Sequence, residues 1–444
     1  MFGFNNFDKK IGLNDLPGQC LNESFWHNAI LNWDRTKSVL FVGDNLPYLK
    51  ALATCNPGIA DMCYIDPPYN TGSTFLYNDT RKSERNGPFG THSAWMAFMF
   101  PRLVTAREVL KESGVIAISI DDYEYAHLKI LMDLIFGEHN LIGTIVVCRS
   151  KNGKGSKKNL AVSHEYLLIY GKSNKAVLRG EVDKTDYDKQ DKFGKYRIDG
   201  LFRKKGVDSL RTDRPNMYYP LYCNPTSGEV SVEPVINWKI VYPTDSKGIE
   251  RRWIWGPETA RERAWQLYTS KNGVVYVKNY VPAFGIEKRT KVRSLWDDTN
   301  FYTERGTNEI TALFGAKVFD TPKPMAYIKK IIDVCSADDA LIIDFFAGSG
   351  TTGQAVAELN EADNGSRKCI LMESDCEIPA NHLARAKGFK TISEITEKRL
   401  HLTQEEHNSF LFNVISLANK PVINLGKNGK SCIKILYSTK LNFA

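Results

Sequence analysis

The sequence lacks the features that would place this protein in a membrane or outside the cell. No apolar run reaches the roughly 18 residues that a membrane-spanning helix requires. The opening residues, MFGFNNFDKKIGLNDLPGQ, do not have the basic-then-apolar order of a secretory signal peptide. We therefore expect a cytoplasmic protein that is not associated with a membrane.

The nine cysteines are scattered along the chain, and none forms a C-x-x-C pair. Several lie inside apolar runs, such as ADMCYID and KCILMES. This pattern is typical of buried thiols in a reducing compartment and argues against a disulfide framework or a zinc site, so we predict no structural metal. The chain also contains no G-x-x-x-x-G-K-[ST] loop, which excludes an ATP-driven translocase within it.

The composition is that of a folded protein with two or three domains. The chain has 444 residues, of which 11% are aromatic and 25% charged, and its net charge is +8. Four basic clusters stand out, at residues 148–159, 201–206, 248–253 and 286–293. Any one such cluster is typical of solvated surface, but four of them beside tyrosines and tryptophans suggest contacts with nucleic-acid phosphates and bases.

The order of apolar runs predicts an α/β fold with a parallel, doubly wound sheet. From about residue 38 to 170, strand-like runs alternate with helical patterns, including a helix over 93–114 that ends at Gly114. From about 171 to 295 the chain is polar, aromatic and punctuated by prolines, which predicts an insertion of short strands and loops. The α/β pattern resumes near residue 322.

The stretch YIDPPYNTG places Asp66, Pro67, Pro68 and Tyr69 directly after a predicted strand. Asp and Pro are ordinary turn residues, and Pro-Pro continues neither a strand nor a helix, so a plain turn is one interpretation. A functional loop is the other. The motif alone does not decide between them, because short motifs also occur by chance.

A second loop, DFFAGSGTTG, spans residues 344–353 between a predicted strand and a predicted helix. Its glycines fit G-x-G-x-x-G, and glycine lets the backbone approach a ligand at the carboxyl end of a sheet. Glu373, at the end of the next predicted strand, is placed to accept hydrogen bonds from ribose hydroxyls. A tight turn with a solvated Glu373 is the alternative. S-adenosylmethionine fits this pattern better than a nicotinamide cofactor does, because no hydride-transfer residue is evident.

With both loops identified, the chain resembles the amino-group DNA methyltransferases, whose acceptor motif is D-P-P-Y and whose cofactor motif is F-x-G-x-G. The order here is the acceptor motif at 66–69, a variable segment, PKP at 322–324 and FAGSG at 346–350, which is the β-class arrangement. The stretches DPPYNTG, GVIAISIDD, FGEHNLI, SHEYLLIYGK, SLWDDTN, VFDTPKP and TISEITEKRL are most similar to the modification subunits of type III restriction systems. The resemblance covers about residues 38–170 and 293–400.

This resemblance implies a Rossmann-like, S-adenosylmethionine-dependent methyltransferase fold in circularly permuted order, with an inserted, irregular α+β target-recognition domain. The corresponding domains are an N-terminal extension (1–37), an acceptor half (38–170), a target-recognition domain (171–292), a cofactor half (293–409) and a C-terminal tail (410–444). The resemblance also implies double-stranded DNA as substrate and a homodimer. The chain is short for a type III subunit, so both a restriction partner and a solitary enzyme stay open.

The resemblance gives the acceptor motif a chemical explanation. An adenine amine is a poor nucleophile because its lone pair is delocalised into the ring. The Asp66 carboxylate and the Pro67 carbonyl can each accept one of its N–H groups and free that lone pair, while Tyr69 stacks on the flipped-out base. Adenine-N6 methylation is the predicted reaction. Cytosine-N4 methylation needs the same acceptors, and a catalytically silent DNA-binding regulator is an alternative from another class.

The remaining assignments depend on position in the motifs. Asp44 matches an acidic position that contacts the cofactor's adenine, although a helix N-cap explains it equally well. Lys323 is expected near the cofactor's carboxylate, or merely at the start of a helix. The full cofactor-binding set is Asp44, Lys323, Asp344, Phe346, Ala347, Gly348, Ser349, Gly350, Thr351, Thr352 and Glu373. The predicted DNA contacts are Lys151, Lys154, Lys157, Arg251 and Arg252, whereas Tyr218, Tyr219, Trp253 and Trp255 are expected to be core of the inserted domain.

Overall fold

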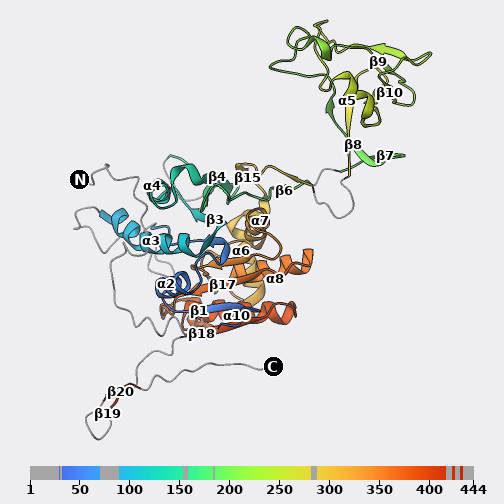
Figure 1. The fold of residues 1–444 in the computed structure, drawn as a ribbon. Helices are drawn as coiled ribbons and strands as arrows, with labels where there is room; N and C mark the ends of the chain where they lie inside the picture. Colours follow the sequence, from blue (N-terminus) through green and yellow to red (C-terminus); the bar gives the residue numbers. More distant parts are fainter. Residues whose placement is uncertain are drawn as a thin grey trace, which may run out of the picture. The chain divides into compact units, whose positions relative to one another are not determined.

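The computed structural model describes residues 30, 33–70, 90–153, 159–183, 186–281 and 288–416, and the backbone of 423–425 and 431–433. The chain divides into two compact units (Figure 1). We call Met1–Glu181 with Lys291–Ala444 the sheet unit and Val182–Thr290 the inserted unit. Each unit is described by itself below.

The sheet unit is built on one nine-stranded sheet, in the order β15-β4-β5-β3-β2-β16-β17-β1-β18. In that order the strands are β15 (Leu295–Trp296), β4 (Leu141–Cys148), β5 (His164–Gly171), β3 (Leu110–Ile120), β2 (Ala60–Ile65), β16 (Leu341–Asp344), β17 (Lys368–Glu373), β1 (Ser38–Val42) and β18 (Phe412–Ser416). All neighbours are parallel except β5, which is antiparallel to both β3 and β4. The predicted α/β sheet is confirmed, with one reversed strand that the pattern of apolar runs did not reveal.

Strands from the two ends of the chain interleave at the centre of this sheet. β16 and β17 lie between β2 and β1, and β16 pairs with β2 through Ile343 and Cys63. Parallel strands end at the same edge of a sheet, where open α/β folds bind their ligands. The loops after β1, β2, β16 and β17 therefore meet at one edge, although Asn45 and Phe345, which are hydrogen-bonded there, lie 300 residues apart in sequence.

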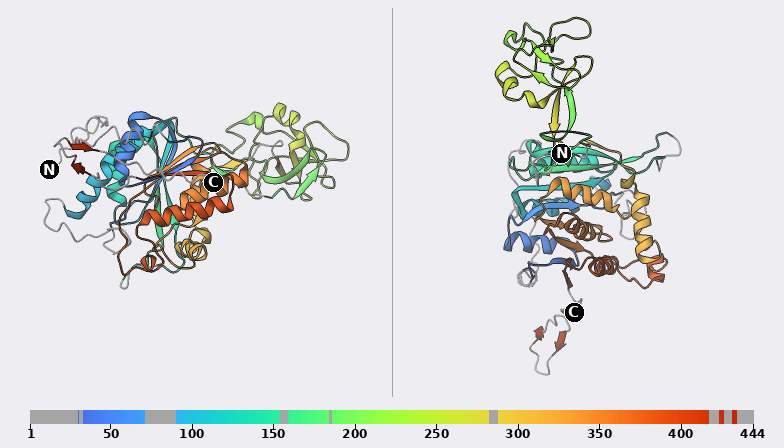
Figure 2. Two further views of the ribbon diagram at one scale, coloured as in Figure 1. Left: turned by 90° about the horizontal axis from the view of Figure 1, so that it is seen from below. Right: turned by 90° about the vertical axis from the view of Figure 1, so that its right-hand side faces the viewer.

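Helices cover both faces of the sheet (Figure 2). One face packs against α2 (Asn45–Cys55), α3 (Gly90–Val109) and α4 (Tyr125–Phe136). The other packs against α7 (Met325–Cys335), α8 (Thr351–Asp363) and α10 (Ile392–Glu406). Along β2 the side chains alternate between these two cores, as the two-residue period of a strand requires: Cys63 and Ile65 face the first, Met62 and Tyr64 the second.

Smaller elements complete the sheet unit. They are α6 (Thr303–Phe314), α9 (Leu383–Ala386), β19 (Ile423–Leu425) and β20 (Ser431–Ile433). None of the described helices is long and apolar enough to cross a membrane. A capping box fixes the start of α10, where the side chains of Thr391 and Glu394 each bind the other's backbone N–H.

The predicted helix over 93–114 is wrong at its C-terminal end. Helix α3 stops at Val109, and β3 begins at the next residue, where Leu110 pairs with Ala60. A register shift follows this pair, and Gly114 lies within it. A Cβ at Gly114 would come within 2.9 Å of the Lys111 carbonyl oxygen, so this glycine allows a close backbone approach and does not end a helix.

The described part of the inserted unit contains two small antiparallel sheets and one short α-helix. Their strands are β9 (Leu221–Cys223), β10 (Val230–Ser231) and β11 (Lys239–Val241), and β7 (Lys189–Asp191), β8 (Gly194–Leu201), β12 (Leu267–Thr269) and β13 (Val275–Tyr280). The helix is α5 (Pro257–Glu262), and a two-stranded ribbon of β6 (Glu181–Val182) and β14 (Arg289–Thr290) joins the two ends of the insertion.

The core of the inserted unit is aromatic. Trp253 is 2% exposed and stacks on Phe202 with ring centroids 5.2 Å apart. Tyr219 and Trp255 are half-buried and pack against this core. Tyr218 differs, because it is half-buried but stacks on Tyr242 outside that cluster. The core prediction is thus confirmed for Trp253, Tyr219 and Trp255, whereas Tyr218 lies at the surface.

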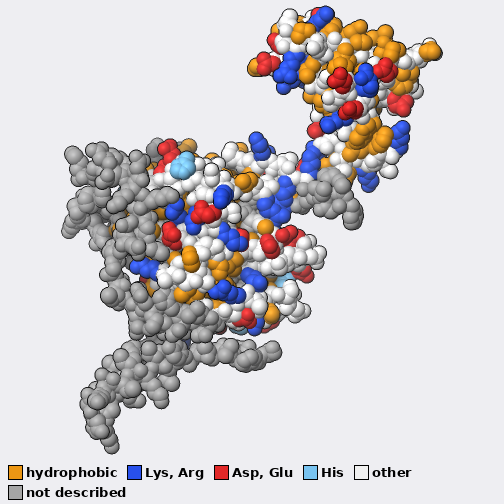
Figure 3. Space-filling view, viewed as in Figure 1, with side chains coloured by type: hydrophobic (Ala, Val, Ile, Leu, Met, Phe, Trp, Pro, Cys, Tyr) orange, Lys and Arg blue, Asp and Glu red, His pale blue; other side chains and the backbone are white. Residues whose placement is uncertain are grey.

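The inserted unit carries most of the protein's net charge. Its sequence contains 20 Lys and Arg against 14 Asp and Glu, a net charge of +6 out of +8 for the whole chain. On the face shown in Figure 3, basic and acidic side chains of this unit are interspersed with apolar ones. A net positive unit with a mixed surface can attract a polyanion without being a single basic patch.

Candidate active site

The loop that follows β2, residues 66–70, is fixed by contacts to two helices. The indole Nε1 of Trp95, on α3, donates to the Pro68 carbonyl at 2.6 Å. Asn70 has a positive φ of 56°, and its side-chain amide donates to the buried carboxylate of Glu124, which precedes α4. The two prolines restrict the backbone further. This loop is therefore held in one conformation before any ligand binds.

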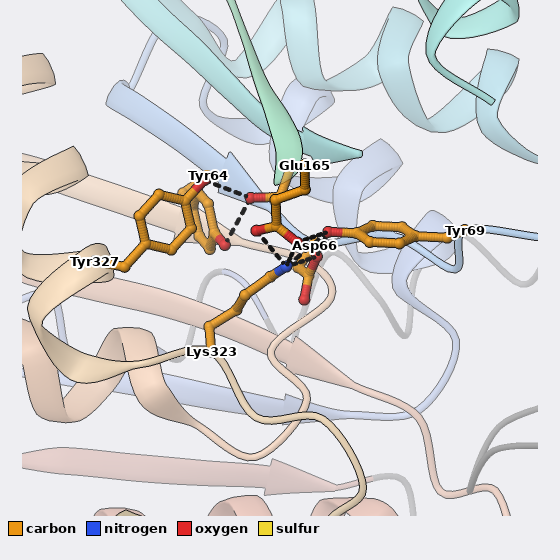
Figure 4. Close-up of polar contacts among 7 residues, drawn as sticks. Tyr64, Asp66, Tyr69, Glu165, Lys323 and Tyr327 are labelled. Atoms are coloured by element: carbon orange, nitrogen blue, oxygen red, sulfur yellow. Dashed lines mark hydrogen bonds and ion pairs between the residues drawn. The ribbon is translucent and has the colours of Figure 1, made fainter. Parts of the chain in front are cut away.

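Four side chains meet at this loop (Figure 4). The Tyr69 hydroxyl donates to Oδ1 of Asp66 at 2.6 Å. The Lys323 ammonium lies 3.2 Å from the same oxygen, 2.7 Å from the Tyr69 hydroxyl and 2.9 Å from both carboxylate oxygens of Glu165. No group in the described part of the chain donates to Oδ2 of Asp66. One carboxylate oxygen is thus held internally and the other is open to a ligand.

Burial and charge set the protonation of this cluster. Burial raises the pKa of Asp66, and the nearby Lys323 cation offsets only part of that rise. Burial alone would lower the pKa of Lys323, but the charges of Asp66 and Glu165 more than compensate, so its pKa is raised. Lys323 therefore stays protonated and serves as counterion to two carboxylates.

Beneath the cluster, three hydroxyl groups join α7 to the sheet. Tyr64 of β2 and Tyr327 of α7 each lie 3.1 Å from the Ser119 hydroxyl of β3, and all three side chains are buried. Figure 4 shows Tyr64 and Tyr327 side by side next to Lys323. Because Lys323 lies two residues before α7 begins, these bonds also fix the position from which its side chain reaches Asp66.

The glycine loop between β16 and α8 is closed by hydrogen bonds from its own ends. The buried carboxylate of Asp344 accepts from the Thr352 hydroxyl and from the Phe346 amide at 3.0 Å. Gly348 and Gly350 have φ angles of +53° and +83°, which a side chain would strain. Burial raises the pKa of Asp344 to about 7. The loop depends on glycine at both positions.

Glu373, at the end of β17, links the next loop to this one. Its Oε2 accepts from the Gly348 amide at 2.6 Å, and its Oε1 accepts from the amide and the hydroxyl of Ser374. Burial raises the pKa of Glu373 to about 7, although these hydrogen bonds lower it in part. The carboxylate predicted to meet ribose hydroxyls therefore already holds the glycine loop in place.

Asp44 has the N-cap role considered for it, while its contact with the cofactor's adenine stays a prediction. It caps α2 by accepting from the Leu46 amide at 3.1 Å, and it also accepts from Arg102 Nη2 at 2.9 Å. Arg102 donates to the Asn45 side chain at 2.6 Å and lies 3.7 Å above the Phe98 ring. The Asp44 side chain is 61% exposed, so its second oxygen is open to a ligand.

All of these loops open onto one cavity of about 450 Å³, a size that suits a nucleoside-sized ligand. Asp66 and Pro68 line one wall of it. The predicted cofactor-binding residues that line it are Asp44, Lys323, Asp344, Phe346, Ala347, Gly348, Ser349, Thr351, Thr352 and Glu373. The acceptor loop and the glycine loop therefore share a single space, as a transfer reaction between two ligands requires.

Residues 60–379 match the family of DNA methylases. The chain belongs to this family. The methylase is 61% identical over 385 residues to the type II methyltransferase M.KpnI of Klebsiella pneumoniae, a match that covers 86% of this chain and 92% of that protein. It is also 34% identical to the EcoPI Mod subunit of a type III restriction-modification enzyme from Escherichia phage P1, over 86% of this chain.

The StyLTI Mod subunit of Salmonella typhimurium is likewise 34% identical, over 84% of this chain. The methylase spans only 65% and 58% of the lengths of the EcoPI and StyLTI subunits. The resemblance inferred from the motifs is thereby confirmed, including its similarity to type III modification subunits. DNA methylases of this family use S-adenosylmethionine as methyl donor.

The cavity of the methylase fits the nucleoside part of that donor. Phe98 and Phe346 bring two aromatic rings together, 6.1 Å apart, at the cavity wall. Glu373 provides a carboxylate for ribose hydroxyls, and Gly348 leaves room at the floor, where a Cβ would lie 3.3 Å from the Phe319 ring. Apolar walls with a few placed polar groups are typical of such sites.

The two glycines of the loop should respond differently to substitution. Gly348 lines the cavity, but a side chain at Gly350 would meet Thr396 of α10 at 3.2 Å, away from the cavity. We expect Gly348→Ala to weaken S-adenosylmethionine binding about tenfold or more, because the methyl group strains the loop against the ligand. Gly350→Ala should mainly lower the melting temperature, because its methyl group would meet Thr396 and not the cofactor. Calorimetry with the cofactor and thermal unfolding separate the two, and equal cofactor affinities would contradict the assignment.

Lys323 lines the cavity just before α7, and its ammonium group lies between Asp66 and Glu165 at the acceptor loop. Its position near the cofactor's carboxylate stays a prediction. Two further residues of the site were missed, Glu165 and Arg102. Each is a buried charge inside an apolar stretch, HEYLLIY and FMFPRLV, and such a residue needs a partner. A charged residue inside an apolar stretch was therefore the signal by which both residues could have been found in the sequence.

The predicted DNA contacts have different outcomes. Lys151 is exposed, and Lys154 and Lys157 lie outside the described residues. Arg251 is half-buried and pairs with Asp245 at 3.0 Å. Arg252 is 7% exposed and donates to internal groups, including the Asp208 carbonyl. We therefore assign Arg252 a structural role instead of the predicted DNA contact, because its guanidinium is already used inside the unit.

Proposed function

We propose that this methylase transfers a methyl group from S-adenosylmethionine to the N6 amine of an adenine within a specific double-stranded DNA sequence. The observation that supports it best is the state of Asp66. One of its oxygens is bound by Tyr69 and Lys323, and the other is open toward the cavity that the glycine loop lines. A hydrogen-bond acceptor beside a cofactor space is what activation of an amine requires.

The chain's own residues supply the activation. The Asp66 carboxylate and the Pro67 carbonyl each accept one N–H of the amine, which draws the nitrogen toward tetrahedral geometry and frees its lone pair. When bound, S-adenosylmethionine supplies a methyl group activated by its sulfonium. Lys323 keeps Asp66 ionised until the transfer. The methylated nitrogen then carries one proton too many, and Asp66 accepts it because burial has raised its pKa.

The base has to leave the DNA duplex to reach this loop. Asp66 lines a cavity that a base pair inside a duplex cannot enter. Tyr69 is held by its hydroxyl, so its ring is fixed and presents a stacking surface for a flipped adenine. Aromatic stacking compensates part of the cost of unstacking the base.

Cytosine-N4 methylation needs the same pair of acceptors, and the test therefore has to identify the modified base. The gene should be expressed in a host without other DNA methyltransferases, and its DNA sequenced by a single-molecule method that reports base and context. We expect N6-methyladenine at one recurring sequence, and none in a host that expresses Asp66→Ala. N4-methylcytosine at a recurring sequence would replace the adenine assignment and leave the mechanism intact.

We also propose that the inserted unit reads the DNA sequence. Its net charge of +6 supports attraction to phosphates, and its separate core allows it to vary without disturbing the cavity. The sequence predicts this domain over residues 171–292, and Val182–Thr290 is the part that forms a compact unit. Residues 171–181 belong to the sheet unit, where the backbone of Arg179 bonds to Val334.

Exchanging the inserted unit should transfer the target sequence. We expect a chimera that carries the segment corresponding to Val182–Thr290 from a relative with another target to methylate that relative's sequence. The reason is that base-edge contacts carry discrimination, whereas phosphate contacts add affinity to any sequence. Modified sites are mapped by single-molecule sequencing. A folded, active chimera that still methylated the original sequence would place recognition outside this unit.

The partners of the methylase follow from its relatives only as proposals. Type III Mod subunits belong to restriction-modification enzymes, but the methylase aligns over almost the full length of a type II methyltransferase. We propose that it acts without a permanently bound restriction subunit, as a homodimer in the cytoplasm where its DNA substrate is found. Light scattering of the purified chain, alone and with DNA, tests the dimer.

A further inference from the structure

A cluster of two histidines and a glutamate lies outside the cavity described above. His92 is in the first turn of α3, Glu124 directly precedes α4, and His127 is in the first turn of α4. The sequence predicts no structural metal, and the three residues have no familiar metal-ligand spacing, since 31 residues lie between His92 and Glu124. None of the three lines the cavity.

The geometry of the cluster centres on one carboxylate. The Glu124 side chain is fully buried, and each of its oxygens faces one imidazole. His92 Nδ1 lies 2.8 Å from Oε1, and His127 Nδ1 lies 3.0 Å from Oε2. The two rings are stacked, with centroids 4.2 Å apart. One ligand atom from each residue lies within 4.8 Å of the other two.

Two polar atoms of this cluster have no hydrogen bond. Oε2 of Glu124 and Nδ1 of His127 are both buried, and neither has a hydrogen-bond partner in the described part of the chain. Only 3.0 Å separates them, yet their orientation is not that of a donor and an acceptor. Unpaired buried polar atoms are unfavourable, so they call for a ligand that both can contact at once. A cation satisfies a carboxylate oxygen and an imidazole lone pair together.

We propose that His92, Glu124 and His127 bind a divalent transition-metal ion, of which zinc is representative. Imidazole nitrogen selects such ions over magnesium and calcium, which prefer oxygen ligands. Zinc bonds to nitrogen and oxygen of about 2.0–2.2 Å place ligand atoms about 3.5 Å apart, within reach of small side-chain rotations here. The histidine side chains are 38% and 33% exposed, so the ion can enter and water can complete its coordination.

This site is coupled to the acceptor loop through Asn70. The Asn70 amide donates to Oε1 of Glu124, the oxygen that also faces His92. Asn70 directly follows Tyr69 of the acceptor motif. A metal ion on Glu124 would fix the carboxylate, and with it the end of the loop that carries Asp66. The inference of a metal site does not depend on the proposed methyl transfer.

Zinc binding to the full-length protein tests the proposal without DNA or cofactor. Titration of Zn²⁺ in a calorimeter should show one tight site, and Mg²⁺ at the same concentration should give none. His92→Gln and His127→Gln should each weaken zinc binding at least tenfold. His139→Gln is the matched control, because His139 is an exposed histidine just beyond α4. This variant should bind zinc with the affinity of the wild type.

X-ray absorption of the zinc-loaded protein should show nitrogen and oxygen ligands including two imidazoles, which separates this site from binding by the exposed thiol of Cys376. Circular dichroism checks that both variants are folded. Equal zinc affinity of the wild type and the double variant His92→Gln, His127→Gln would overturn the proposal. So would sulfur ligation in the absorption spectrum.

Discussion

Replacing Asp66 by alanine should lower kcat about a thousandfold or more, while the affinity for S-adenosylmethionine changes little. Asp66 makes its decisive contact when the amine attacks, so its loss removes transition-state stabilisation and spares ground-state binding of the cofactor. The carboxylate reaches the cavity from the loop after β2, whereas the glycine loop and Glu373 come from other strands. Single-turnover methyl transfer and calorimetry with the cofactor measure the two effects separately.

Asp339→Ala is the matched control for this substitution, because Asp339 is an exposed aspartate of the same unit and does not line the cavity. It should have wild-type kcat. The alanine variant also removes the Tyr69 hydroxyl's acceptor, so Tyr69→Phe should be measured beside it to show how much of the loss comes from ring positioning. An Asp66→Ala enzyme within tenfold of the wild-type rate would refute the acceptor mechanism.

The parts of the site that were predictable from the sequence are those in which adjacent residues act together. Asp66 to Tyr69 form one loop, and Asp344 to Thr352 form one strand-to-helix turn, so a local motif contains their geometry. Their proximity also followed from the fold, because parallel strands end at one edge. Glu373 could be placed for the same reason, as the last residue of the neighbouring strand.

The contacts of Lys323 and Arg252 could not be predicted, because both are long side chains whose partners lie far away in sequence. Lys323 bonds to Tyr69 across 254 residues and to Glu165 across 158 residues, and nothing in PKP indicates which carboxylate it meets. Arg252 belonged to a basic cluster but points into its own unit, toward the Asp208 carbonyl. A charge pattern gives the number of cations in a segment and not the direction in which each one points.

The reversed strand β5 is a similar case at the level of the fold. Its eight residues, HEYLLIYG, are as apolar as a buried parallel strand, and only the character of its connection to β4 distinguishes it. Parallel neighbours need a crossover of a dozen or more residues that is usually helical, and the segment between Cys148 and His164 is basic and contains no helical pattern. An antiparallel return was therefore the better prediction. Glu165 reaches Lys323 because it lies at the start of this reversed strand.

Replacing Lys323 by methionine should lower kcat about a hundredfold or more at neutral pH and shift the pH dependence. Methionine keeps the bulk of the side chain but leaves the half-buried Asp66 and the buried Glu165 without their shared cation. The Lys323 charge lowers the pKa of Asp66, so its removal raises that pKa. Only the ionised carboxylate can accept an amine N–H with either oxygen. Activity should therefore be lost at neutral pH and recover as the pH rises.

Lys329→Met is the control, because Lys329 lies on the adjacent helix α7 and pairs with Glu358 well away from Asp66. Its pH profile should be that of the wild type. The same electrostatic argument predicts a partial rescue. The charge of Glu165 raises the pKa of Asp66, so Glu165→Gln in the Lys323→Met background should move the pH profile back toward neutrality and restore part of kcat.

A purely structural role for Lys323 gives a different pattern in the same measurements. If the lysine only holds Tyr69 and the start of α7 in position, then kcat falls at every pH, the midpoint of the pH profile does not move, and Glu165→Gln adds a second loss. That result would reject Lys323 as the counterion of the acceptor. A shifted midpoint with rescue by the double substitution would show that one cation keeps the acceptor Asp66 ionised beside the second carboxylate, Glu165.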